Sequence, residues 1–86
     1  MLCQNYPNPF NPSTTFRFTL NKNADISLII YDESGRMMDI VIDNKFHSTG
    51  NQELVYSNGN LSSGVYFYSL IANGVLIDSK KMVLIY

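Results

Sequence analysis

His47 is the only histidine of the chain and the residue best suited to proton transfer near neutral pH. With a serine and an aspartate it would form a nucleophilic triad, in which the imidazole takes the proton of the serine hydroxyl. Nine serines are scattered along the sequence, but none lies in a Gly-x-Ser-x-Gly turn. We therefore expect no catalytic site, and we expect His47 to lie in a polar loop and to make a local hydrogen bond.

Four acidic side chains lie in pairs that are candidates for a calcium site: Asp32 with Glu33, and Asp39 with Asp43. A loop of the Asp-x-Asp-x-Asp-Gly kind is absent, so solvated carboxylates in turns are the better interpretation. One histidine and one cysteine, Cys3, are too few for a structural zinc site, and a lone cysteine forms no internal disulfide. The sequence thus predicts no metal and no other cofactor.

Aromatic residues concentrate in the segment Tyr66-Phe67-Tyr68, with Tyr56 before it. If their rings were exposed and coplanar, they would stack on a sugar or bind a protein partner; if buried, they would be core. The alternation of the segment favours core for Phe67 and leaves both interpretations open for Tyr66 and Tyr68. Nearby, Asn60-Leu61-Ser62 matches a glycosylation sequon, a short match that is common by chance.

An alternation of apolar and polar residues runs through most of the chain and predicts β-strands. The first inward faces are Phe16, Phe18 and Leu20, then Ala24, Ile26, Leu28 and Ile30. Further strands are expected at residues 36–42, 52–56, 64–72, 75–79 and 82–86, with a tight turn at Gly35, a polar loop at residues 43–50 and a hairpin turn at Asn73-Gly74. About seven short strands without a helix predict an all-β, antiparallel β-sandwich.

The N-terminal residues 1–14 are expected to form an extended arm before a sandwich domain at residues 15–86. The arm carries all three prolines of the chain, which fix the backbone and remove donors that a central strand would need. Tyr6 and Phe10 would pin the arm to the surface of the domain. At the other end of the chain, the apolar run 82–85 would be stable only when paired in a sheet, and at a sheet edge it would be open to strand addition.

Size and charge restrict the partners of this chain. Its 86 residues form one small domain, and a net charge of −1 provides no basic field for nucleic acid. Its apolar runs are far shorter than the roughly 20 residues that span a bilayer. The first residues contain no apolar signal-peptide region, so we expect this chain to be a piece of a longer precursor.

Four motifs in this order resemble the type A C-terminal sorting domain of type IX (Por) secretion cargo in Bacteroidetes-like bacteria. They are Gln4-Asn5-Tyr6-Pro7-Asn8-Pro9-Phe10-Asn11-Pro12-Ser13-Thr14-Thr15, Ile30-Tyr31-Asp32 with Gly35-Arg36, Leu61-Ser62-Ser63-Gly64-Val65-Tyr66-Phe67-Tyr68, and Lys81-Met82-Val83-Leu84. The resemblance implies a seven-stranded, immunoglobulin-like sandwich that addresses an upstream cargo protein. It further implies passage through the periplasm, recognition by the outer-membrane translocon, and processing by a sortase-like protease at the cell surface, where the cargo is retained or released.

By the same resemblance, three segments carry the translocon-recognition residues: Pro7, Asn8 and Pro9; Gly64, Val65 and Tyr66; and Lys81, Met82, Val83 and Leu84. The chain departs from the family pattern at two places. Members often have Trp-Asp-Gly where Tyr56-Ser57-Asn58-Gly59 stands here, and many end on a Lys or Arg, whereas this chain ends on Tyr86. Two alternatives remain at this stage: an accessory carbohydrate- or protein-binding module of a secreted enzyme, and the similar immunoglobulin-like domain of flagellar hook-assembly scaffolds. The expected state is a monomer or a strand-swapped dimer without stable membrane insertion.

Overall fold

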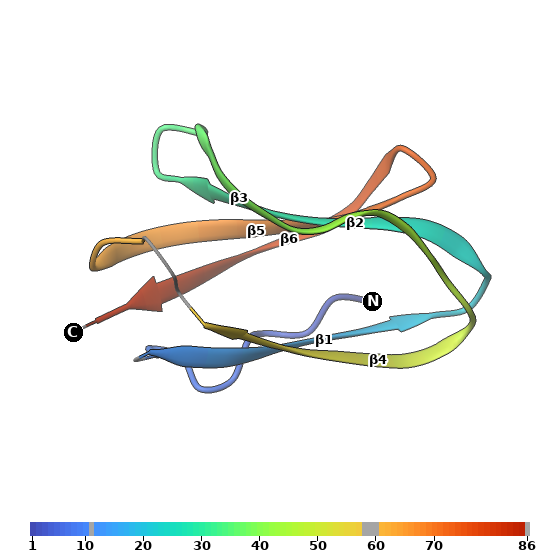
Figure 1. Ribbon diagram of the computed structural model, residues 1–86, viewed down its shortest axis with the longest axis horizontal. Helices are drawn as coiled ribbons and strands as arrows, with labels where there is room; N and C mark the ends of the chain where they lie inside the picture. Colours follow the sequence, from blue (N-terminus) through green and yellow to red (C-terminus); the bar gives the residue numbers. More distant parts are fainter. Residues whose placement is uncertain (11, 58–60, 86) are drawn as a thin grey trace.

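The computed structural model describes residues 1–10, 12–57 and 61–85, and its regular elements are strands in two layers (Figure 1). The strands are β1 (Ser13–Leu20), β2 (Ala24–Asp32), β3 (Met37–His47), β4 (Gly50–Ser57), β5 (Gly64–Ala72) and β6 (Val75–Leu84). One layer is the antiparallel pair β1-β4, and the other is an antiparallel sheet in the order β3-β2-β5-β6. The prediction of an all-β, antiparallel sandwich is confirmed.

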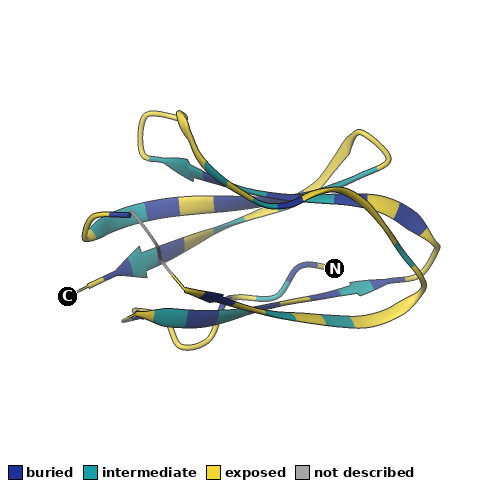
Figure 2. Ribbon diagram, viewed as in Figure 1, coloured by how far each residue is buried: buried dark blue, intermediate teal, exposed yellow. Residues whose placement is uncertain are grey.

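Strict alternation along the strands builds the core between the two sheets. Phe16, Phe18 and Leu20 are buried on β1, and so are the four alternate residues of β2 that were predicted to face inward, Ala24, Ile26, Leu28 and Ile30. The same alternation is visible as bands along the strands in Figure 2. Because successive side chains of a strand point to opposite faces, the position of each apolar residue in the sequence decides which face is buried.

The predicted turns at Gly35 and Asn73-Gly74 are confirmed. Gly35 has a φ of 86°, and the hairpin residues Asn73 and Gly74 have φ values of 51° and 79°. This left-handed conformation is cheap for glycine and tolerated by asparagine, and it matches the twist of the two strands that the hairpin joins.

Two expected boundaries were wrong. The segment 43–50 is not a loop, because β3 continues to His47, where it pairs with Ala24 of β2, and β4 begins at Gly50. Polar residues are tolerated there because β3 is an edge strand with one side in water. The segments 75–79 and 82–86 were expected to be separate strands, but β6 runs unbroken from Val75 to Leu84 alongside β5, so the described residues form six strands and not seven.

The N-terminal residues run beside β1 and then cross to β6, so they contact both sheets. Tyr6 pairs with Thr15 of β1, and Phe10 pairs in parallel with Leu84 of β6. Phe10 is 1% exposed, as predicted for a residue that pins the arm. The side chain of Tyr6 is 68% exposed, so Tyr6 attaches the arm through its two backbone hydrogen bonds with Thr15 instead. The bonds Tyr6–Pro7 and Asn8–Pro9 are both cis.

Candidate functional site

The fold brings the three predicted recognition segments together at one end of the sandwich. Strand register places Gly64, Val65 and Tyr66 of β5 directly opposite Leu84, Val83 and Met82 of β6. The arm reaches the same place, because the backbone N–H of Val83 donates to Oδ1 of Asn8 at 2.8 Å. The arm, which is more than fifty residues from the other two segments in the sequence, therefore meets them at one place.

The outer edge of β6 is occupied by the arm at this end. Phe10 donates its N–H to the carbonyl of Val83 at 3.0 Å, and its own carbonyl accepts from the N–H of Ile85 at 3.1 Å. Nε2 of Gln4 donates to the carbonyl of Lys81 at 2.6 Å. The terminal strand does lie at a sheet edge, as its apolar sequence suggested, but from Lys81 to Ile85 the arm uses backbone groups that a partner strand would need.

A buried polar network fixes the arm in this position. The hydroxyl of Tyr68, on β5, accepts the N–H of Asn5 at 2.7 Å and donates to the carbonyl of Cys3 at 2.7 Å. Nδ2 of Asn5 donates to Oγ1 of Thr14 at 2.9 Å and to the carbonyl of Pro7 at 3.1 Å. Since Asn5, Thr14 and Tyr68 are buried, each bond also satisfies a group that would be costly to leave unpaired.

Burial raises the pKa of the Tyr68 hydroxyl to about 12, so it remains protonated and able to donate at neutral pH. Its ring packs against Phe16 of the opposite sheet with centroids 4.7 Å apart. Tyr68 thus links the arm, the four-stranded sheet and the two-stranded sheet.

The ten predicted residues divide into a surface and its support. Pro7, Asn8, Pro9 and Lys81 are exposed, whereas Gly64, Val65 and Val83 are half-buried. Tyr66, Met82 and Leu84 are buried, and the hydroxyl of Tyr66 donates to the carbonyl of Ser62 at 2.6 Å. The first seven are accessible to a partner, and the last three hold the strands beneath them.

The aromatic residues do not form the sugar-binding platform that was one interpretation of the sequence. Tyr56, Tyr66 and Tyr68 are all buried. Phe67 was expected in the core, but it is 37% exposed, because its neighbours on β5 point inward and the alternation turns it outward. The alternative function of a carbohydrate module therefore loses its candidate rings.

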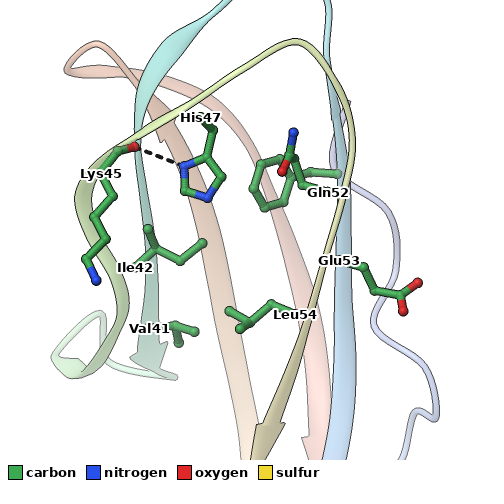
Figure 3. A pocket seen from close by; sticks show the side chains of 8 residues that line it. Val41, Ile42, Lys45, His47, Gln52, Glu53 and Leu54 are labelled. Carbon is green, nitrogen blue, oxygen red and sulfur yellow. Dashed lines mark hydrogen bonds between the residues drawn. The ribbon is translucent and has the colours of Figure 1, made fainter.

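His47 lies at the end of β3 in an open cleft of about 240 Å³ between β3 and β4 (Figure 3). Its Nδ1 lies 3.0 Å from the carbonyl oxygen of Lys45, which is the local hydrogen bond expected for it. The ring also meets the edge of Phe18 at 6.0 Å. The residues that line the cleft include no serine, threonine or cysteine, and Figure 3 shows Glu53 directed away from the imidazole, so a triad is not assembled there.

The candidate calcium ligands have other roles. Oδ1 of Asp32 accepts bonds from the backbone N–H and hydroxyl of Ser34 and from the N–H of Arg36, and the Ser34 hydroxyl is the main cause of a lowered pKa for this carboxyl. Oδ2 of Asp39 accepts the hydroxyl of Tyr56 at 2.7 Å. In the described part of the chain, no three acidic, histidine or cysteine residues lie close enough to hold a metal ion.

The glycosylation sequon and the segment that departs from the family pattern lie partly outside the described residues. In the sequon, Asn60 falls outside the described residues, as do Asn58 and Gly59 of the segment that departs from the family pattern. Within the described ranges, no helix is long and apolar enough to cross a membrane.

The residues that sequence reasoning missed are those that attach the arm: Gln4, Asn5 and Thr14. Their polar side chains give no periodic signal. The partners of Gln4 and Asn5, at Lys81 and Tyr68, are more than fifty residues away, whereas Thr14 bonds to Asn5, nine positions away.

Comparison with protein families gives a match over residues 4–85 to the model Por_Secre_tail, described as a secretion system C-terminal sorting domain. Comparison with curated proteins and with solved structures gives no match. The matched range contains the arm from Gln4 onward, the side chains of the polar network, and the paired ends of β5 and β6 that the arm meets. The chain therefore belongs to the family of secretion system C-terminal sorting domains, and it is a sorting signal for type IX secretion.

Proposed function

We propose that the outer-membrane translocon recognises the convergent end of the sandwich, which we define as Pro7, Asn8, Pro9, Val65, Lys81 and Val83. The observation that supports this is the meeting of the arm with Val65 of β5 and Val83 of β6. Such a surface exists only after folding. A receptor that reads it would therefore select cargo whose sorting domain has already folded in the periplasm.

In this proposal the buried residues Tyr66, Met82 and Leu84, together with the half-buried Gly64, position the surface. The domain performs no chemistry of its own: it is an address for a cargo protein fused upstream, which is exported to the cell surface or the extracellular space. A sortase-like protease would then cut before Gln4. The domain needs neither a cofactor nor nucleic acid for this role.

The arm, residues 1–14, belongs to the recognition unit together with the sandwich at residues 15–86. Because it covers β6 from Lys81 to Ile85, the domain is expected to be a monomer while the arm is seated. A strand-swapped dimer would require the arm or β6 to detach first.

A reporter fusion tests the proposal. Residues 4–86 are fused to the C-terminus of a fluorescent protein that carries a signal peptide, and export is measured by cell fractionation in a type IX-competent bacterium and in its translocon-deleted sibling. We expect reporter at the surface or in the medium of the competent strain alone. Retention of a folded fusion in the periplasm of both strains would contradict the function.

Two variants test the surface. Lys81→Gln and Asn8→Ala change exposed groups of the convergent end, and Lys22→Gln changes an exposed lysine in the turn between β1 and β2. We expect the first two to lower the exported fraction several-fold, whereas Lys22→Gln leaves it unchanged. Equal export by all three would place recognition elsewhere on the domain.

A further inference from the structure

The two outer faces of the sandwich differ in polarity. On the two-stranded sheet, Arg17 of β1 is paired with Glu53 of β4, and Thr19 is hydrogen-bonded to Asn51 through side-chain oxygens at 2.9 Å. This face is polar apart from Val55, and its groups are well suited to water. The polarity of its outward side chains can be compared with that of the outer face of the four-stranded sheet.

On the four-stranded sheet, apolar residues occupy neighbouring outward positions on three strands, although Asp25, Ser27 and Ser69 on the same face are polar. Tyr31 of β2 is directly opposite Met37 on one side and Phe67 on the other, and Ile29 is opposite Ile40. Met37 is 51% exposed and Phe67 is 37% exposed. We call Ile29, Tyr31, Met37, Ile40 and Phe67 the outer apolar face.

The outer apolar face is continuous with the convergent end. Phe67 is directly opposite Lys81 of β6, and two pairs further along, on the same face, Val65 is opposite Val83. Outward side chains of directly opposed residues are close neighbours. A partner that covers Val65, Lys81 and Val83 therefore has Phe67 and Tyr31 at the border of its contact area.

We infer that the translocon's contact surface extends from the convergent end across the outer apolar face, an inference that rests on the proposed function. Interfaces are centred on apolar and aromatic residues that lose contact with water, and polar groups form the rim. Phe67 and Tyr31 are suited to the centre, whereas Lys81 and Asn8 belong to the rim. The partner is accordingly a protein surface with an apolar patch and an acidic group that meets Lys81.

Within the described ranges, Met37, Ile40 and Phe67 of the outer apolar face remain exposed to water. The described arm lies on β1 and on the outer edge of β6. Contiguous exposed apolar side chains on a small domain commonly mark a surface that is covered in its working state. The continuity with the convergent end favours one receptor over two separate ligands.

Export of the reporter fusion is the test. Phe67→Ser and Met37→Ser remove exposed apolar contacts from the outer apolar face, separately and together. Val55→Ser is the matched control, because Val55 is an exposed apolar strand residue of the opposite outer face. We expect about a tenfold loss of exported reporter for the double variant, which corresponds to about 1.4 kcal/mol, and no change for the control.

Measurements on the purified domains accompany the test. Thermal unfolding must show that each variant is folded, and Met37→Ser provides a second probe if Phe67→Ser is destabilised. Wild-type export by folded Phe67→Ser and Met37→Ser, with export lost by Lys81→Gln or Asn8→Ala, would overturn the inference and leave the proposed function intact. Failure of the unmodified domain to direct export would instead contradict the proposed function.

Sedimentation of the unmodified domain gives a further check. A concentration-dependent dimer that Phe67→Ser dissociates would show that a second copy covers the outer apolar face, and this would also overturn the inference. A monomer over the whole concentration range supports it.

Discussion

The sandwich has two long sides, one of which is covered by the N-terminal arm. On one side the arm joins β1 to β6 through Tyr6 and Phe10, and we call this the closed seam. On the other side lie the edge strands β3 and β4, which we call the open seam. Across the open seam, no backbone hydrogen bond links the two strands in the described ranges, and a side-chain bond joins Tyr56 to Asp39.

The difference shows how a small domain fixes a surface made of distant segments. The closed seam contains Leu2, Asn5 and Phe10, which are buried although they precede the first strand. The open seam retains an accessible cleft with His47 at its end. The arm fills the closed seam and holds the convergent end in one arrangement. The residues that line the open seam have fewer packing partners, so their substitution should affect stability less.

The largest difference between the seams is expected for Phe10→Ala compared with Phe46→Ala. Phe10 is fully buried in the closed seam, so truncation should lower the free energy of unfolding by about 3–5 kcal/mol. Phe46 is 65% exposed on β3, and its truncation should change the free energy by less than about 0.5 kcal/mol. Denaturant unfolding of both variants measures this, and equal losses would show that the seams are equivalent.

The second largest effect is expected at high pH, where ionisation of Tyr68 in the closed seam should lower the free energy of unfolding. Tyr68 has a pKa of about 12 in the fold, against about 10 for an unfolded tyrosine. Its contribution to stability is complete below pH 10 and is lost as pH rises from 10 to 12, by at most about 1.4 kcal/mol per pH unit. Unfolding at a series of pH values, with phenolate absorbance as the probe, tests this.

The control for the pH series is Tyr68→Phe, which should flatten the dependence. Burial also raises the pKa of Tyr56 in the open seam, so part of the slope should persist in this variant. An unchanged slope would show that the buried hydroxyl of Tyr68 does not titrate with folding.

At neutral pH, Tyr68→Phe should cost about 1–3 kcal/mol, because it removes the acceptor for Asn5 and leaves that buried N–H unpaired. Tyr56→Phe is the matched change in the open seam. Its hydroxyl donates to the half-exposed Asp39, which water can solvate after the change, so the expected loss is about 1 kcal/mol or less. Thermal unfolding of the two variants compares them, and the reverse order would contradict the role of Tyr68 in seating the arm.

The smallest effect is expected for Asn8→Ala. Its side chain accepts one exposed bond from Val83, so global stability should fall by less than about 1 kcal/mol. Hydrogen exchange should nevertheless quicken at Val83 while β3 and β4 are unchanged. Exchange that quickens equally on both sides would show that the seams open together.

Particular residues show how far the sequence alone determined this structure. The alternation in β1 and β2 fixed their inward faces, and Gly35 and Asn73-Gly74 fixed two turns, because strand geometry and positive φ are local constraints. The motifs of the arm, β5 and β6 also sufficed to identify the family, since their order and spacing lie along the chain.

Tertiary structure decided what depends on distant partners. The polar end of β3 is a strand because β2 lies beside it, and the residues from Lys81 to Ile85 are covered because the arm returns to them. Nothing local to Asn5 or Tyr68 indicates that they bond to each other across sixty-three positions. The sequence determined which side chains each strand turns inward, but the assembled sheets decided which edges are open and which distant segments share a surface.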